Sequence, residues 1–297
     1  MLSSLRLAPI SLRFTNRRHL ATPITRSLVT KTPIIPVDLE YDQVIPSDGN
    51  AKDGALVILH GLFGSKRNWQ SLAKVFSKEL QRPVYALDLR NSGMSPHVKP
   101  MTYRAMAADV IHFCNKHRLR DISLIGHSMG GKVAMSVALD PELPPSFLGR
   151  LIVVDITPAR AELSSEFKGY IEGMKKIEAS KVKTRKQAEE ILMEFEKDAS
   201  VRAFLLTNIS LPTPSNPYVH FRIPISILEE ALPEIGGFPY KPEERKWLGN
   251  TLLIQGSLSR YTNDDNVELA TQYFPELTLE QILAGHWVHS EKISSKW

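Results

Sequence analysis

The segment GHSMGGK, residues 126–132, fits two unrelated motifs. Counted from Gly126, its spacing G-x-x-x-x-G-K is that of a loop that binds nucleotide phosphates. Centred on Ser128, it is G-x-S-x-G, the frame of a serine nucleophile at a sharp turn from a strand into a helix. Both patterns are short enough to occur by chance, so the surrounding sequence has to distinguish them.

Short apolar runs alternate with amphipathic segments along the chain. Apolar runs without polar alternation lie at residues 55–60, 83–89, 121–126, 151–156 and 251–256. Segments of helical length and periodicity lie at residues 67–80, 102–117 and 129–139. Continuous apolar strands are typical of parallel sheets that are covered on both faces. The sequence therefore predicts an α/β fold with a mostly parallel sheet.

The alternation stops after the strand that ends at Asp155. Residues 157–247 contain a charged helical stretch, the segment RAFLLTNI and a proline-rich segment, without a strong strand pattern. About 90 residues between two core strands exceed an ordinary loop. We interpret residues 157–247 as a helical cap, inserted into a core formed by residues 38–156 and 248–297.

The residues within and after GHSMGGK favour the nucleophile motif. A phosphate-binding loop needs a Ser or Thr hydroxyl after its lysine to bind Mg²⁺, and this position is Val133. At a nucleophile turn, side chains two residues before and after the serine collide with neighbouring backbone. Gly126 and Gly130 occupy those two positions, so Ser128 is the predicted nucleophile.

His286 is the predicted general base. Nucleophile, acid and histidine follow one another in this order in α/β hydrolases, and AGHWVH comes after the last predicted strand, ELTLEQIL. His289 is the alternative, but it begins the terminal helical segment and would face away. Simpler roles at turns, in the core or on the surface are expected for His60, His97, His112, His117, His127 and His220.

The predicted acid is Asp155, at the end of the strand in LIVVDITP. Site residues of open α/β sheets collect at the carboxyl ends of strands. The turn after TLLIQG, where many such enzymes carry the acid, has no carboxylate before Asp264 and Asp265, which remain the alternatives. A purely structural reading is that Asp155 caps the turn into the insertion.

Two backbone N–H groups are predicted to bind the oxyanion of the transition state. Met129 follows the nucleophile directly, and Leu62 lies in the loop HGLFG after the first apolar run. A further turn at the same sheet edge, residues 88–97, contains Asp88 and Arg90, which we expect to brace it.

The positive charge of the chain is concentrated at its start. Of 37 Lys and Arg residues, six lie in residues 1–37, so the remainder has 31 against 32 acidic side chains. This near balance predicts no nucleic-acid partner. Residues 1–30 have the Arg- and Ser-rich, acid-free composition of a mitochondrial transit peptide, with cleavage expected after Leu20; a disordered basic arm is the alternative. No run approaches the ~20 apolar residues of a transmembrane helix.

Cys114 is the single cysteine, which excludes an intramolecular disulfide and a cysteine metal cluster. It lies in the apolar stretch IHFC and is expected to be a buried small side chain. We predict no metal site.

Several motifs together resemble one family. They are HGLFGSKRNW, DLRNSGMSPH, MTYRAMAADV, GHSMGGKVAM, VVDITPA, RAFLLTNI and AGHWVH. They are similar to the mitochondrial α/β hydrolases related to abhydrolase-domain protein eleven, a group that includes the yeast ethanol acetyltransferases. The resemblance runs from about residue 54 to 292, and in that family the acid follows the strand before the cap, which supports Asp155. The chain stops eleven residues after His286, so its closing helix is shorter than the family usually has.

The resemblance implies transfer of an acetyl group from acetyl-CoA to ethanol through an acetyl-serine, giving ethyl acetate, with thioesterase and esterase side reactions. Acetyl-CoA is then a substrate, and no separate cofactor is implied. The animal-type branch implies hydrolysis alone, and a catalytically silent binding protein is a third alternative. The basic run Lys175, Lys176, Lys181, Lys183, Arg185 and Lys186 fits either coenzyme phosphates or a solvated helix face, and we favour the solvated face.

Overall fold

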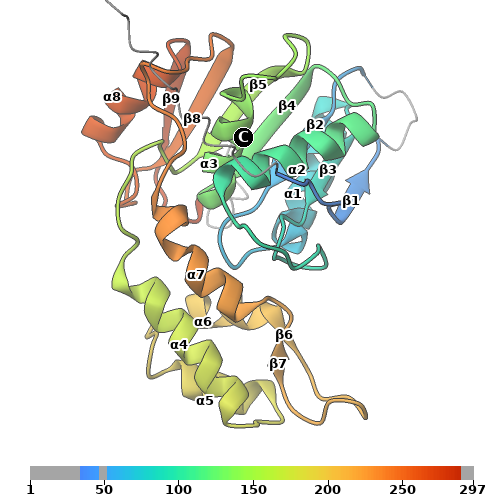
Figure 1. Cartoon of the computed structure of the whole chain (residues 1–297), viewed down its shortest axis with the longest axis vertical. Helices are drawn as coiled ribbons and strands as arrows, with labels where there is room; N and C mark the ends of the chain where they lie inside the picture. Colours follow the sequence, from blue (N-terminus) through green and yellow to red (C-terminus); the bar gives the residue numbers. More distant parts are fainter. Residues whose placement is uncertain (1–33, 47–51, 289–297) are drawn as a thin grey trace, which may run out of the picture. The chain divides into compact units, whose positions relative to one another are not determined.

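A seven-stranded sheet organises the chain (Figure 1). This computed structural model describes residues 34–46 and 52–288; the expected transit peptide and His289 lie outside the described residues. The strands are β1 (Tyr41–Val44), β2 (Leu56–Leu59), β3 (Val84–Leu87), β4 (Ile122–His127), β5 (Leu148–Val154), β8 (Asn250–Gly256) and β9 (Leu277–Ile282). Their order across the sheet is β1-β3-β2-β4-β5-β8-β9. Among the seven described strands of this sheet, only β1 pairs antiparallel, with β3, so the predicted α/β fold with a mostly parallel sheet is confirmed.

The edge strand β1 was not predicted, because its sequence carries little strand signal. YDQV has four residues of which none is fully buried, whereas every residue of β2 and β3 is buried. A short, half-exposed antiparallel strand at a sheet edge lacks the continuous apolar run of a central parallel strand. It is held by its pairing with β3, a contact that local sequence does not reveal.

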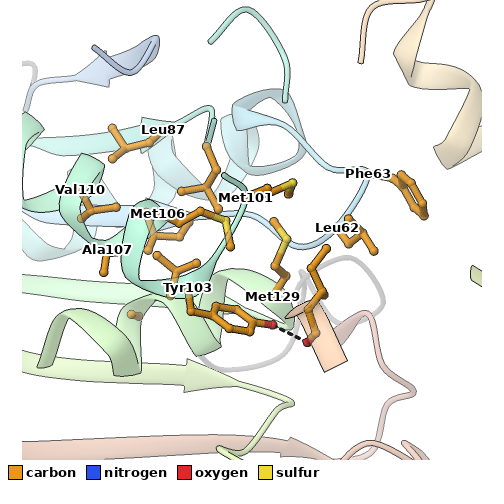
Figure 2. Close-up of a cluster of buried hydrophobic side chains, with 14 of the residues drawn as sticks. Leu62, Phe63, Leu87, Met101, Tyr103, Met106, Ala107, Val110 and Met129 are labelled. Atoms are coloured by element: carbon orange, nitrogen blue, oxygen red, sulfur yellow. Dashed lines mark hydrogen bonds between the residues drawn. The ribbon is translucent and has the colours of Figure 1, made fainter. Parts of the chain in front are cut away.

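Helices cover both faces of the sheet. Three lie close to the predicted ranges: α1 (Gln70–Leu80), preceded by the 3₁₀ helix η1 (Lys66–Trp69), α2 (Tyr103–Lys116) and α3 (Met129–Ala138). The helix α8 (Asp264–Tyr273) was not predicted. The Thr102 side chain accepts a hydrogen bond from Ala105 N and so begins α2. Figure 2 shows part of the larger core, with Val110 and Leu87 at one end and Tyr103, Met129 and Leu62 at the other.

The cap between β5 and β8 is mostly helical. Its elements are α4 (Ser165–Ala179), α5 (Arg185–Leu192), α6 (Ala199–Leu205), the 3₁₀ helix η2 (Leu206–Asn208), β6 (Ile209–Ser210), β7 (His220–Phe221) and α7 (Ile225–Gly236). The expectation of no strands here was wrong, because β6 and β7 form a small antiparallel sheet. Each has only two residues, too few for a period-2 pattern to be seen.

The helix α7 lies within the proline-rich segment and was also not predicted. Pro233 is inside it and lacks the N–H that would bond to the carbonyl of Glu229. Leu228, Leu232 and Ile235 are buried at helical spacing. This apolar face stabilises the helix in spite of the proline.

Hydrogen bonds join the cap to the core. Tyr103 Oη in α2 donates to the carbonyl of Ile235 in α7, at 2.7 Å (Figure 2). Lys132 Nζ in α3 donates to the carbonyls of Ala159 and Gly237, at 2.8 and 2.9 Å, on the two chain segments that lead into and out of the cap. Burial, aided by the charge of Arg160, lowers the pKa of Lys132 to about 8. One ammonium in the helix after Ser128 thus ties down both ends of the cap.

Among the described residues, no helix is both long and apolar enough to span a bilayer.

Candidate active site

Ser128 occupies a strained turn between β4 and α3. Its backbone has φ 53° and ψ −122°, a conformation that L-residues seldom adopt. A Cβ added at Gly126 would lie 2.2 Å from the carbonyl oxygen of Gly130. One added at Gly130 would lie 2.5 Å from the carbonyl oxygens of Leu59 and His60. The two glycines are required because the backbone passes this closely, as the nucleophile motif predicts.

Val133, which distinguished the two motifs, is fully buried in the core. It belongs to the larger hydrophobic core. The geometry of residues 126–132 is that of a nucleophile turn.

Asp155 and His286 form a hydrogen-bonded pair. Asp155 follows β5 directly, and its Oδ2 lies 2.6 Å from Nδ1 of His286, which lies in the loop after β9. The carboxylate is fully buried and the imidazole is 19% exposed. A carboxylate at Nδ1 holds the imidazole with Nε2 free to accept a proton. The alternatives Asp264 and Asp265 are exposed in the first turn of α8.

Three further donors hold the Asp155 carboxylate in place. Oδ1 accepts from Gly256 N at 3.0 Å and from Thr262 Oγ1 at 2.9 Å, and Oδ2 accepts from Ser259 Oγ. Gly256 ends β8, and Ser259 and Thr262 lie in the turn that follows, where the sequence has hydroxyl groups instead of a carboxylate. The end of β8 and the turn after it therefore carry no acid of their own, but supply the hydrogen-bond donors to Asp155.

His286 is packed between two aromatic rings. The ring of Tyr261 lies 4.1 Å from the imidazole, centroid to centroid, and the ring of His127 lies 4.8 Å away. His127 Nε2 also donates to the carbonyl of His286 at 2.9 Å. The expectation that His127 is simply a turn or core residue was incomplete, since it fixes the backbone of the loop that carries His286.

Ser128 and His286 line one cavity of about 490 Å³. Among the described contacts, no hydrogen bond joins their side chains. In unliganded enzymes such bonds are often long and shorten when substrate binds. Ser128, His286 and Asp155 thus share one site, in which His286 and Asp155 are hydrogen-bonded.

The loop HGLFG lies against the nucleophile. A Cβ added at Gly61 would be 3.3 Å from Cβ of Ser128, and Gly64 N donates to the carbonyl of Gly61 at 3.0 Å. Met129 is the first residue of α3. In the described part of the chain, the N–H groups of Leu62 and Met129 donate to no protein acceptor, so both remain available to a ligand.

His60 braces this loop, a role that sequence analysis did not assign to it. Its Nε2 accepts from Leu89 N at 3.0 Å, so Nδ1 carries the proton and donates to the carbonyl of Gly61 at 2.8 Å. Burial lowers the pKa of His60, which keeps the ring neutral. The one sequence feature that could have indicated this role is the position of His60, directly after a buried apolar strand.

The neighbouring turn is braced as expected. The Asp88 carboxylate accepts from Lys66 N at 2.7 Å and Met94 N at 3.0 Å. Arg90 pairs with Asp109 through two N–H groups, at 2.5 and 2.6 Å. The Asp88 and Arg90 side chains are both buried and hydrogen-bonded within the protein, so they fix the turn rather than face a substrate.

The cap contacts the HGLFG loop directly. Asn208 of η2 is buried, and its Nδ2 donates to the carbonyl of Phe63 at 2.8 Å. Phe63 has a positive φ of 60° and follows Leu62. The cap therefore helps to fix the backbone whose N–H is the predicted oxyanion donor.

Two cavities meet at Ser128. The 490 Å³ cavity has aromatic walls formed by Phe63, Trp69, Phe167, Phe204 and Trp287. The second, of about 400 Å³, is also mostly apolar, but its lining includes the polar residues Lys132, Thr157, Arg260, Asn263 and Asn266. Leu62, Ser128 and Phe167 line both. A nucleophile at this junction can be approached from two sides.

A serine on a strained strand-to-helix turn, together with a buried Asp–His pair at neighbouring strand ends, defines an enzyme of the α/β-hydrolase class. The chain belongs to the family described as alpha/beta hydrolase fold, whose family model matches residues 54–293.

Known proteins similar to this chain include both hydrolases and an acetyltransferase. An sn-1-specific diacylglycerol lipase ABHD11 of Xenopus tropicalis is 40% identical over 86% of this chain and 78% of its own. A probable alcohol acetyltransferase of Saccharomyces cerevisiae is 36% identical over 87% of this chain and 80% of its own. The solved structure of a marine microorganism esterase is 33% identical, with a TM-score of 0.77, over 86% of this chain and 95% of its own. Acyl-transfer or hydrolase chemistry is common to this group.

Proposed function

We propose that the protein is an alcohol acetyltransferase that makes ethyl acetate from acetyl-CoA and ethanol. The junction of two cavities at Ser128 carries this proposal, because a transferase needs one approach for the acyl donor and one for the acceptor. The similarity to a probable alcohol acetyltransferase supports it.

In the first half of the proposed reaction, Ser128 Oγ attacks the thioester carbonyl while His286 Nε2 removes its proton. Asp155 at Nδ1 stabilises the resulting imidazolium, and the N–H groups of Leu62 and Met129 bind the oxyanion. The carbon–sulfur bond then breaks, and His286 gives its proton to the leaving sulfur. An acetyl-serine remains.

In the second half, His286 removes a proton from ethanol, whose oxygen attacks the acetyl carbon. The bond to Ser128 Oγ breaks, the proton returns to the serine, and ethyl acetate leaves. Water in place of ethanol gives acetate, so transfer and hydrolysis differ only in the acceptor. The aromatic walls of the larger cavity favour the alcohol by excluding water from the acyl group.

A serine ester or thioester hydrolase without physiological transfer is the second candidate. It is favoured by the aromatic 490 Å³ cavity, which has room for an acyl chain longer than acetyl, and by the similarity to a lipase and an esterase. In this case the acetyl-serine is replaced by a longer acyl-serine that water removes.

Product analysis distinguishes the two candidates. The protein is incubated with acetyl-CoA and increasing ethanol, and ethyl acetate in the headspace is measured beside free acetate. We expect ethyl acetate to become the main product as ethanol rises, with acetate falling in proportion. Acetate as the sole product at saturating ethanol would leave the hydrolase as the function.

We also propose that residues 1–30 direct the protein to mitochondria, on the basis of their composition. Protein purified from mitochondria is expected to begin near Ala21, as read by N-terminal peptide mass spectrometry. A mature protein that still contains Met1 would contradict cleavage on import.

A further inference from the structure

Three arginines lie in, or contact, segments that line the aromatic cavity, and none has a carboxylate partner in the described part of the chain. Arg185 begins α5 and lines the cavity itself. Arg222 follows β7, lines a separate cavity with Met94 and His97, and bonds to Thr207 of the aromatic wall. Arg67 lies in η1 beside Asn68, which lines the aromatic cavity. Among the described residues, no Asp or Glu lies within ion-pair distance of these three guanidinium groups. We refer to Arg67, Arg185 and Arg222 as the arginine cluster.

One short segment of the cap positions two of these guanidinium groups. Arg185 donates to the carbonyls of Leu206 and Ala203, at 2.8 and 3.1 Å. Arg222 donates to the carbonyls of Thr207 and Ile209, at 2.5 and 3.1 Å. Ala203 and Thr207 are themselves part of the cavity wall. Each guanidinium uses only part of its five N–H donors in these bonds, so both have donors left for a ligand.

Arg67 and Arg222 are close enough to repel each other. Burial lowers the pKa of Arg222, and the charge of Arg67 lowers it further, while the charge of Asp88 raises it. The Asp88 oxygens are already engaged by Lys66 N, Lys66 Nζ and Met94 N. The nearby Asp88 carboxylate is therefore shared with Lys66, and the like charges of Arg67 and Arg222 leave a net positive charge that attracts a polyanion.

The basic residues elsewhere on the cap differ from this cluster. Lys175 pairs with Glu229 at 2.6 Å, and Lys176 pairs with Glu194 at 2.5 Å, both on exposed faces. For these two lysines, the predicted solvated helix face is confirmed. Arg185, which belongs to the same basic run, is also exposed as predicted, but it lines the cavity of Ser128 as well.

From this placement we propose that the arginine cluster binds the phosphate groups of a coenzyme A thioester whose acyl group lies at Ser128. The inference rests on the proposed function for its substrate. The pantetheine arm separates the thioester from the phosphates, which suits a cationic site that is distinct from the nucleophile. Guanidinium groups bind phosphate through paired, charge-assisted hydrogen bonds. A neutral glyceride ester offers nothing for this cluster to bind.

The proposal is tested by the ratio of kcat/KM for two substrates, one with nucleotide phosphates and one without. The value of kcat/KM is measured for acetyl-CoA and for S-acetylpantetheine, which has the same thioester but no nucleotide phosphates. In the Arg185→Gln/Arg222→Gln double variant, we expect the ratio of the two values to fall by at least about tenfold, because hydrogen bonds to charged groups are lost. In the wild-type protein the ratio should also fall as salt rises.

Two further variants make the result decisive. Lys175→Gln/Lys176→Gln removes the same charge from the cap and should keep the wild-type ratio. Arg67→Gln, at an exposed side chain with no described hydrogen bond, should lower the ratio and does not disturb the cap segment. A wild-type ratio in both arginine variants, or an equal fall in the lysine control, would overturn the proposal.

Inhibition by free CoA separates this site from the proposed reaction. Hydrolysis of p-nitrophenyl acetate is followed with CoA added, which needs no acetyl-CoA turnover. Competitive inhibition that weakens in Arg67→Gln supports the site even if acetyl-CoA proves not to be a substrate. Absence of inhibition in the wild-type protein would overturn it. Stronger inhibition by phosphatidylglycerol vesicles than by CoA would also overturn it, since the cluster would then contact a membrane surface.

Discussion

Replacement of Ser128 by alanine is expected to lower kcat on the order of a million-fold, for thioester and ester substrates alike. In the proposed mechanism both reactions pass through the same acyl-serine, so the Ser128 oxygen is needed for both. The rates are measured with acetyl-CoA and with p-nitrophenyl acetate, and folding is checked by thermal unfolding.

Ser136→Ala is the matched control for this variant. Ser136 is a buried serine in α3, the helix that follows Ser128, and its Oγ donates only to the carbonyl of Lys132. Its loss should cost about 1 kcal/mol of stability and leave kcat near the wild-type value. A Ser128→Ala protein with more than a hundredth of wild-type activity would exclude Ser128 as the nucleophile.

Replacement of Asp155 by asparagine is expected to lower kcat about ten-thousand-fold. The carboxylate accepts from His286 Nδ1 at 2.6 Å, and its other partners, Gly256 N, Thr262 Oγ1 and Ser259 Oγ, are also donors. The asparagine amide would place an NH₂ donor among groups that are themselves donors. Where that NH₂ faces His286 Nδ1, the imidazole is held with its proton on Nε2, which then cannot accept a proton. The measurement is the steady-state rate with both substrates, at pH 7 and above.

Asp264→Asn is the control for Asp155→Asn, because Asp264 is exposed at the start of α8. It is expected to keep wild-type kinetics. Loss of activity in Asp264→Asn together with retention in Asp155→Asn would reverse the assignment of the acid.

Local sequence was sufficient for those parts of the fold and site that depend on short patterns. The buried strands follow from continuous apolar runs, and the turn at Ser128 follows from Gly126, Gly130 and Val133. The Asp155–His286 pair was predictable because parallel strands bring their carboxyl ends to one sheet edge. Asp155 and His286 are 131 residues apart in sequence, but the topology alone brings them together.

The supporting contacts were not predictable, because each joins residues whose pairing depends on the folded cap or on loop geometry. Asn208 contacts Phe63 across 145 residues, and nothing in RAFLLTNI identifies that partner. Ser259 and Thr262 read as ordinary turn residues until the Asp155 carboxylate is placed beside them. The helix α7 was hidden by Pro233, since its stability comes from packing against the rest of the molecule rather than from propensity.

The central claim, an acetyl-serine at Ser128, is tested most directly by trapping that intermediate. The protein is mixed with acetyl-CoA, quenched in acid and digested, and the peptide that contains Ser128 is examined by mass spectrometry. We predict one acetyl group on Ser128, absent from Ser128→Ala and lost faster when ethanol is added. Steady turnover of acetyl-CoA with no acetyl group on Ser128, or an acetyl group that persists elsewhere in Ser128→Ala, would contradict it.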